Sequence, residues 1–321
     1  MFKTILFFFL ILSSVNAQIS GCTDPLSKNY NPLTTINNGS CQYALIKIKP
    51  TYSNKISDSI KETSGLILFN NLLWTHNDDH DKTIYGLDTL GNIKRKIVLD
   101  KVKNNDWEEI SQDSTHIYIG DFGNNYAGNR TDLHILKIEK KSFLEGNPNI
   151  EKISFQYANQ ADFSPKKQNT TNFDCEAFIV SKDTIYLFTK EWSTSKTSIY
   201  ALPNRSGNHV AQLKDTLDTK GLVTGATYLE SKKLLALCGY SKLGKPFLYL
   251  LYDYKNNDFL SGNKRRITIK LPIIQIEGIA TNDGLHYYLT NESLVRKPII
   301  NVPQQIHRID LTSILGSYLH K

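Results

Sequence analysis

The sequence lacks the short motifs that identify the common classes of enzyme. It contains no Gly-x-Ser-x-Gly elbow, no His-Glu-x-x-His pair and no glycine loop of the kind that cradles phosphate. Its 4 cysteines do not cluster with its 8 histidines, so a zinc site of the usual kind is not expected. The motifs alone therefore leave open whether the protein is an enzyme.

Charge of one sign is not concentrated in any part of the chain. The 38 lysines and arginines give a formal net charge of +7, but they are scattered, often beside aspartate or glutamate. A nucleic-acid-binding protein usually gathers its basic residues in a stripe or cluster. We therefore expect no nucleic-acid partner and interpret the excess as general surface charge.

Long apolar runs are missing except near the N-terminus, where Lys3 precedes an apolar stretch from Ile5 to Leu12. This stretch is too short to span a bilayer. Val15-Asn16-Ala17 fits a small-residue cleavage site, so residues 1–17 are predicted to be a cleaved signal peptide. We expect a secreted or cell-surface protein with no transmembrane segment, in a compartment where disulfides persist.

Residues 18–42 are predicted to form a separate small unit with two alternative uses of Cys22. Ile19-Ser20-Gly21-Cys22 resembles a lipobox, but Cys22 lies far beyond Leu12 for such a site. A disulfide between Cys22 and Cys41 is the other use, and closing that loop stabilises a fold by roughly 3 kcal/mol.

The same unit resembles a short cysteine module of secreted bacterial surface proteins. The resemblance rests on Gly21–Pro25, Asn29–Pro32 and Gly39–Cys41. In that module an acidic pair before Gly-Ser-Cys implies calcium. Here the pair is Asn37-Asn38, so we expect any calcium site to be weak, and a disulfide-stapled spacer is the alternative.

Strand patterns dominate from Tyr43 to the end, residues 43–321. Apolar, β-branched and aromatic runs are bounded by Gly, Asn, Asp and Ser. The first strands of successive repeats align in one column, about 44 to 53 residues apart with one longer step of about 68, at Ser64, Glu108, Glu176, Thr224 and Glu277. This period predicts an all-β fold, a β-propeller.

Five blades are predicted. The fifth repeat lacks a fourth strand, and the spare strand at Tyr43–Lys49 is expected to complete it and close the ring. Six blades are the alternative, with the extra blade in the long step. Residues 159–172 within that step are polar and contain one proline, which favours a loop.

Candidate site residues converge in this architecture. The first strand of a blade lines the channel and the second runs back beside it, so the start of one and the end of the other share a mouth. We expect a ligand to contact the polar and aromatic residues placed there, namely Glu62, His76, Asn77, Asp106, Trp107, Asp121, Asp174, Trp192 and Asn291.

Carboxylates facing one channel repel each other. They must bind a cation, pair with Lys190 or Arg130, accept backbone hydrogen bonds, or take up protons. Oxygen ligands favour calcium or magnesium, so Glu108, Glu176 and Glu277 are predicted metal ligands, with Ca²⁺ as the expected ion. Capping of strand ends and binding of water is the alternative.

Other residues keep two interpretations. Trp107, Trp192 and Tyr126 could stack on a sugar ring or pack between blades. Cys175 and Cys238 could approach each other as buried thiols or as a disulfide, because spacing alone does not decide this.

The chain resembles a family of exported bacterial propellers whose function is poorly characterised. The matching motifs are Glu62–Leu66, Leu73–Asp78, Asp106–Ile110, Tyr118–Asn125, Asp174–Phe178 and Phe188–Trp192. More distantly, it is similar to esterase-like phytase propellers and calcium-dependent lactonases. The distant resemblance implies a channel metal held by Glu and Asn, but a shared fold does not establish a shared activity.

Two functions follow from these observations. In the first, a monomeric secreted propeller binds a glycan, a peptide or a surface protein at its acidic mouth. In the second, a metal-dependent enzyme hydrolyses an ester, lactone or phosphate. There Glu108, Glu176 or Glu277 act as ligands or base, and Lys190 or Arg130 steadies the anion.

Overall fold

Short strands joined by tight turns make up most of this chain. The computed structural model describes residues 18–296 and 298–320, so the predicted signal peptide lies outside the described residues. Helix is confined to α1 (Lys140–Leu144), α2 (Thr312–Leu319) and the 3₁₀ turns η1 (Asp58–Ile60) and η2 (Glu230–Lys232). Among the described helices, none is long and apolar enough to cross a membrane.

The first three repeats each form four consecutive antiparallel strands. These are β5 (Thr63–Phe69), β6 (Leu72–Asn77), β7 (Thr83–Leu87) and β8 (Ile93–Val98), then β9 (Trp107–Gln112), β10 (His116–Asp121), β11 (His134–Glu139) and β12 (Ile150–Tyr157), then β13 (Cys175–Ser181), β14 (Thr184–Thr189), β15 (Thr197–Pro203) and β16 (Gly207–Leu217). The outer strands β12 and β16 pair in parallel, so the second and third repeats share one eight-stranded sheet.

The last two repeats each recruit a strand from the N-terminal part of the chain. The fourth repeat is β17 (Leu222–Leu229), β18 (Leu234–Tyr240), β19 (Pro246–Tyr252) and β20 (Asn263–Ile269), with β3 (Ile46–Ile48) added in parallel. The fifth is β21 (Ile276–Ala280), β22 (His286–Asn291), β25 (Gln305–Asp310) and β4 (Tyr52–Lys55).

The predicted closing strand was wrong in its residues. We expected Tyr43–Lys49 to complete the last repeat, but β4 pairs with β25 instead, and β3 extends β20. Pro50 lies between the two short strands and cannot donate to a ladder. The chain therefore breaks there, and its two parts pair with neighbouring sheets.

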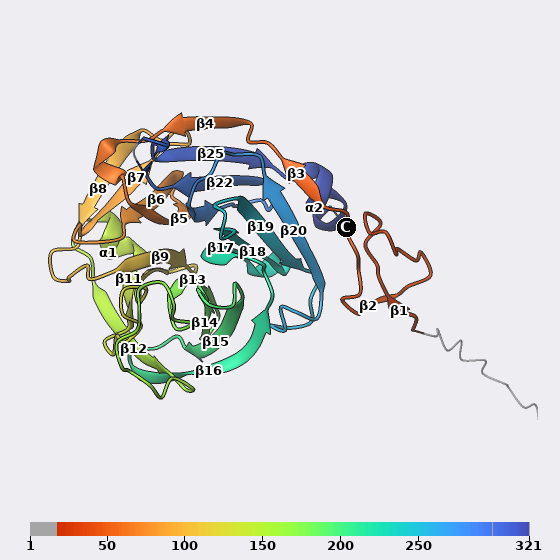
Figure 1. The fold of residues 1–321 in the computed structure, drawn as a ribbon, viewed down its shortest axis with the longest axis horizontal. Coiled ribbons are helices and arrows are strands. Elements are labelled where there is room, and N and C mark those ends of the chain that lie inside the picture. The colour runs from red at the N-terminus through yellow and green to blue at the C-terminus, as the bar shows by residue number, and fades with distance from the viewer. Residues whose placement is uncertain (1–17, 297, 321) are drawn as a thin grey trace, which may run out of the picture.

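The first strands of the repeats form a closed ring around the centre of the molecule (Figure 1). β5 contacts β9, β9 contacts β13, β13 contacts β17, β17 contacts β21, and β21 returns to β5. The fold is therefore an all-β, propeller-like ring. The number of blades stays a prediction, because the eight-stranded sheet merges two repeats.

The apolar core lies between neighbouring repeats. One cluster joins Trp74 of the first repeat to Ile110 of the second and Phe143 of α1. Another joins Phe122 and Phe155 of the second repeat to Phe178 of the third. The inner strands of each unit thus bury both faces against neighbouring repeats, which is why β9, β13 and β18 are nearly all buried, whereas the outer strands β8 and β12 alternate between exposed and buried residues.

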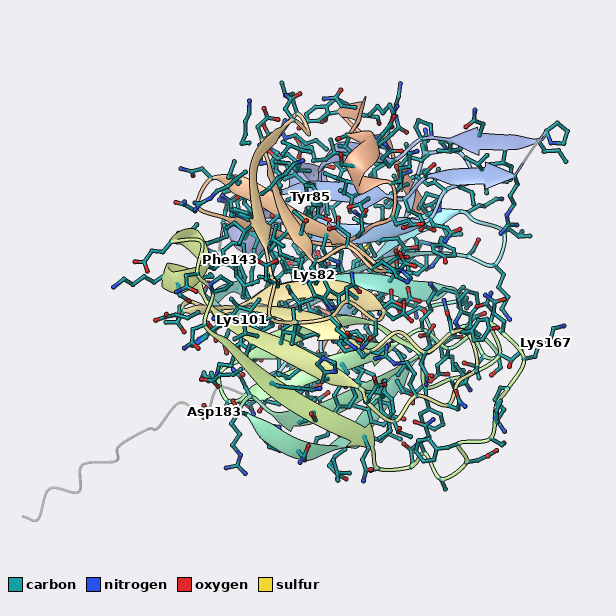
Figure 2. The ribbon with its side chains drawn as sticks, turned by 90° about the vertical axis from the view of Figure 1, so that its left-hand side faces the viewer. Lys82, Tyr85, Lys101, Phe143, Lys167 and Asp183 are labelled. Atoms are coloured by element: carbon teal, nitrogen blue, oxygen red, sulfur yellow. A yellow bond between two sulfur atoms is a disulfide. The ribbon has the colours of Figure 1, made fainter. Side chains whose placement is uncertain are left out.

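Two segments rise at one end of the ring. Residues 159–172 form no strand, as the prediction of a loop required. The hairpin of β23 (Leu294–Arg296) and β24 (Ile300–Val302) pairs only with itself within the described chain. Figure 2 shows this hairpin projecting on the same side as Lys167 of the loop.

The Cys22–Cys41 disulfide is confirmed, with a Cα–Cα distance of 4.8 Å, and the small strands β1 (Ser20–Gly21) and β2 (Ile36–Asn37) pair beside it. Tyr43 and Tyr252 both donate their hydroxyls to Asp24 Oδ2, at 2.8 and 2.6 Å. The unit is therefore bonded to the fourth repeat.

Asn37 shows what the missing acidic pair does in this chain. Its Nδ2 donates to Asp253 Oδ2 at 2.8 Å and to Asn263 Oδ1 at 3.0 Å. An aspartate at this position would have no N–H to donate and would repel Asp253. The asparagine is thus a docking residue.

Replacement of Asp24 by alanine is expected to destabilise the protein by about 2 kcal/mol, because two tyrosine hydroxyls lose their acceptor. Urea unfolding measures the loss. Asp183→Ala, at an exposed turn position, is the control and should change stability by less than about 0.5 kcal/mol. Equal stability of the two variants would show that the docking contacts contribute nothing.

Candidate functional site

Each first strand carries an irregularity at, or directly after, the residue that the sequence aligned in one column. In the pairing of β9, β13, β17 and β21 with their second strands, the register skips Glu108, Glu176, Thr224 and Glu277 respectively. In β5 the skip follows Ser64. A β-bulge frees one residue from the ladder and re-aims its side chain, and here it does so once per repeat.

The hydroxyl members of this column tie neighbouring repeats together. Ser64 Oγ donates to the Glu108 carbonyl, and Thr224 Oγ1 donates to the Ile276 carbonyl. These two residues therefore seal the ring. The three glutamates have no such role and bring charge to the centre.

Glu108, Asp174 and Glu176 form a buried acidic cluster, in which each offers a carboxylate oxygen within 4.8 Å of the others. Asp106 also belongs here, because a Cβ at Gly123 would lie 2.2 Å from both Asp106 Oδ2 and Glu108 Oε1. Only glycine fits at position 123, so the loop after β10 closes directly over the carboxylates.

The repulsion between these clustered carboxylates is relieved in part by the uptake of protons. Burial, and then the charges of Glu176 and Asp106, raise the pKa of Glu108 well above its usual range. Burial and the neighbouring Asp174 raise the pKa of Asp106 to about 7. These groups therefore hold protons at pH values where exposed carboxyls are ionised.

Lys190, just past the end of β14, supplies the counter-charge. Its Nζ donates to Glu176 Oε2 at 2.6 Å, and its side chain is 4% exposed. Burial alone would lower the pKa of an ammonium, but the nearby carboxylates of Glu176 and Glu277 raise the pKa of Lys190 well above its usual value. Lys190 is thus held as a buried cation.

The predicted metal ligands are only partly brought together. Glu108 and Glu176 share the acidic cluster with Asp174, but Glu277 is not in that group. Glu277 is approached by Gln275 at 3.5 Å, and its Oε2 is buried without a hydrogen-bond partner. Burial raises the pKa of Glu277 to about 8, although Lys190 opposes the shift.

Several predicted ligand-binding residues have structural contacts instead. His76 packs edge-on against Trp107 with ring centroids 5.6 Å apart, and both are fully buried. Burial lowers the pKa of His76 to about 4, so it is a neutral core residue at physiological pH. Asp121 accepts from Arg130 at 2.6 Å in a buried ion pair.

The two predicted asparagines also hold the frame. Asn77 Nδ2 donates to the Ser59 carbonyl and to Asp81 Oδ2. Asn291 Oδ1 accepts from His307 Nε2 at 2.8 Å. Glu62 differs from them, because it is exposed and groups with Asp78 and Asp79 at the rim.

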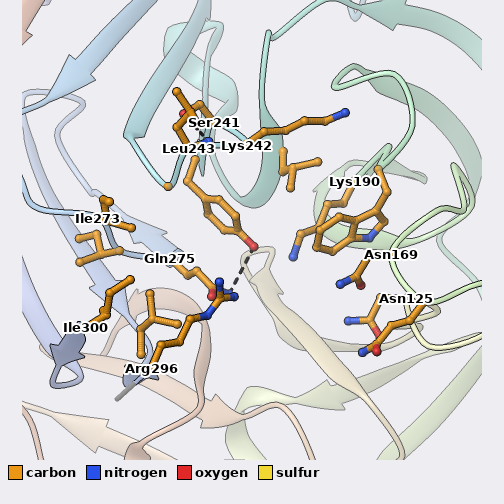
Figure 3. A pocket seen from close by; sticks show the side chains of 17 residues that line it. Asn125, Asn169, Lys190, Ser241, Lys242, Leu243, Ile273, Gln275, Arg296 and Ile300 are labelled. Atoms are coloured by element: carbon orange, nitrogen blue, oxygen red, sulfur yellow. Dashed lines mark hydrogen bonds between the residues drawn. The ribbon is translucent and has the colours of Figure 1, made fainter. Parts of the chain in front are cut away.

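A pocket of about 680 Å³ opens above Lys190 (Figure 3). Trp192, Tyr240, Gln275 and several amides line it together with Lys190, Lys242 and Arg296, whereas no carboxylate does. The acidic cluster therefore lies beneath the pocket, and Lys190 connects the two.

Sequence reasoning missed part of this pocket. Arg296 lies on the β23–β24 hairpin, which matches no strand of the repeat. Gln168 and Asn169 lie in the long loop.

Sequence reasoning also missed Glu109, which lies next to the column outside the pocket. It is fully buried and accepts hydrogen bonds from the amide nitrogens of Ala226 and Ile110 at 2.7 and 3.0 Å. The only feature of the sequence that points to Glu109 is its position directly after Glu108.

Cys175 and Cys238 are both buried and unpaired. Their interpretation as thiols is confirmed, and the disulfide is not formed. Each packs in a separate apolar cluster.

No family model matches the sequence, and no curated protein matches it. Solved structures that resemble the fold include a PQQ-bound aldose sugar dehydrogenase from Streptomyces coelicolor, with 9% identity, a TM-score of 0.44, and coverage of 81% of this chain and 99% of that chain. An α-L-arabinofuranosidase from Podospora anserina in complex with cellotriose has 9% identity, a TM-score of 0.45, and coverage of 82% and 95%. Likeness at this level carries no conclusion about function.

The pKa of Glu277 gives a pH dependence with a defined sign. The folded state holds a proton up to about pH 8, whereas the unfolded chain releases it near its ordinary value of 4.5. Stability is therefore fully present below about pH 4.5 and declines as the pH rises to 8, by at most about 1.4 kcal/mol per pH unit for one proton.

Glu277→Gln is expected to flatten this decline, because glutamine does not ionise. Urea unfolding at pH 5, 6, 7 and 8 measures it. Glu145→Gln, at an exposed position, is the matched control and should reproduce the wild-type slope. An unchanged slope in Glu277→Gln would contradict the assignment of a proton to this group.

Proposed function

We propose that the protein is an exported, five-bladed β-propeller that binds a glycan in the pocket above Lys190. The blade count is supported by the cycle of five mutually contacting first strands. Export is supported by the Cys22–Cys41 disulfide, since such bonds persist outside the cytoplasm.

The composition of the pocket is the observation that carries this proposal. Its volume of about 680 Å³ suits a small ligand. Asn125, Asn169 and Gln275 offer amides that both donate and accept, as sugar hydroxyls require. Trp192 is half-buried and offers a ring face. Ile273 and Ile300 line the pocket across from Lys190 (Figure 3).

A glycan is favoured over a peptide by these groups. A peptide bound in extended form usually adds a strand to an open sheet edge. Tyr240 belongs to β18, which is paired on both sides, and Leu294 and Arg296, two positions apart on β23, present a face of the hairpin to the pocket and not its edge. Amides and an aromatic ring are what remain for recognition.

Loss of the Trp192 ring is expected to weaken glycan binding about tenfold or more, because a buried aromatic contact is typically a dominant one. A panel of oligosaccharides followed by calorimetry identifies the ligand and measures the loss in Trp192→Ala. Trp192→Phe should retain part of the affinity. Tyr126→Ala, which removes an exposed ring outside the pocket, should bind as the wild type does.

A metal-dependent hydrolase is the second candidate, favoured by the three carboxylates of the acidic cluster. Calcium takes six to eight oxygen ligands. Asp174 already accepts from the Asn124 amide and from Trp192 Nε1, both at 2.7 Å, and Glu176 is bonded to the Lys190 ammonium. The residues as placed do not fit calcium, so no catalytic step is assigned to it.

Calcium titration separates the two candidates. A ligand at 100 times its Kd stabilises the folded state by about 2.7 kcal/mol, so a resident ion would shift the melting temperature on addition of EDTA. We expect no shift with EDTA or excess calcium, and no calcium in elemental analysis. A shift that disappears in Glu108→Gln would instead support the hydrolase.

A further inference from the structure

We propose that the ligand of this pocket carries an oxyanion, a carboxylate, sulfate or phosphate, which is seated between Lys190 and Arg296; this rests on the proposed binding of a glycan and names its chemical class as acidic. All charged side chains in the lining of the pocket are cations. The acids of the site lie below and take no part in the lining.

The contacts of Lys190 fix its ammonium in place and leave some of its N–H groups free to bind an anion. Its Nζ lies 4.8 Å from the centre of the Trp192 ring and 5.4 Å from that of Tyr240, which hold it from two sides. An ammonium carries three N–H donors, and the bond to Glu176 uses one. Figure 3 shows the Lys190 amine directed toward the middle of the pocket.

Arg296 supplies the second cation from the opposite wall. It ends β23 and is exposed, and its side chain reaches toward Gln275, which donates to the Tyr240 hydroxyl at 3.3 Å. A guanidinium presents paired N–H groups that match the two oxygens of a carboxylate or sulfate. An oxyanion above Tyr240 would therefore meet donors from Lys190 and from Arg296.

The acids below do not prevent this. Glu176 is bonded to the Lys190 ammonium, and no carboxylate belongs to the lining of the pocket. The charge that a ligand meets at the pocket surface is thus set by the lining cations. A neutral ligand would leave these N–H donors without the charged acceptor that an oxyanion provides.

The test compares acidic oligosaccharides with neutral partners of the same shape. Trigalacturonate and its methyl ester have the same sugar backbone, but the ester carries no charge. A sulfated disaccharide and glucose 6-phosphate, each set against its unsubstituted parent, distinguish carboxylate, sulfate and phosphate. Binding is followed by calorimetry and by tryptophan fluorescence, which reports on Trp192 because Trp74 and Trp107 are fully buried.

At least one acidic probe is expected to bind tenfold or more tightly than its neutral partner, and more weakly at high salt. Arg296→Gln should lower that affinity about tenfold and remove most of the discrimination. Lys141→Gln is the matched control, because it removes the same charge from an exposed lysine outside the pocket, and it should change the affinity less than twofold.

The outcomes separate the two proposals. Equal binding of every acidic probe and its neutral partner overturns the oxyanion and leaves glycan binding standing. If Arg296→Gln still prefers the acidic probe to its neutral partner, the placement of the oxyanion between Lys190 and Arg296 is wrong. Failure of every probe and of the whole oligosaccharide panel overturns both.

Discussion

The extra residue in each first strand is the constraint on which the centre of this molecule depends. In a regular strand, the side chain at a column position would follow the alternation of the ladder and enter a contact between neighbouring sheets. The bulge releases it and turns it to the axis. Glu108, Glu176 and Glu277 reach the centre for this reason, and Thr224 uses the same position to bond the next repeat.

Charges brought together in this way must be compensated locally, and the compensation gives the site its two layers. Below, the acidic cluster is stabilised by Lys190, by hydrogen bonds to Asp174 and by retained protons. Above, Lys190 presents the remainder of its ammonium to the pocket. One lysine therefore belongs to both the acidic cluster and the pocket lining, and no carboxylate of the cluster belongs to that lining.

The repeat was predictable because it is local. An acidic or hydroxyl residue at a strand start recurs at Ser64, Glu108, Glu176, Thr224 and Glu277, and the ring and the shared mouth follow from that column. Burial was harder to foresee. His76 and Trp107 occupy mouth positions in the sequence pattern, but they pack against each other in the core. The prediction of the closing strand was wrong because Tyr43–Lys49 and Tyr52–Lys55 both have the pattern of a strand. Only their pairing with distant strands distinguishes them.

The pocket was the least predictable part, because its walls lie outside the repeat. Arg296, Gln168 and Asn169 are contributed by a hairpin and a loop that match no blade strand, and nothing in their spacing relates them to Lys190. Such insertions do not recur from repeat to repeat, so the search for a repeated pattern does not detect them. They are also where a conserved frame can acquire a particular ligand, since loops vary more freely than the strands that support them.

Closure by β4 has a consequence for the order in which this protein can be completed. Ser53 and His307 are bonded across 254 positions of the chain, so β4 is made long before the strand with which it pairs. Until then the seam is open, and both edges expose unpaired backbone groups that could join another molecule. The ring is therefore completed by one of its most distant pairings, and a chain in which β25 has not yet formed keeps that edge open.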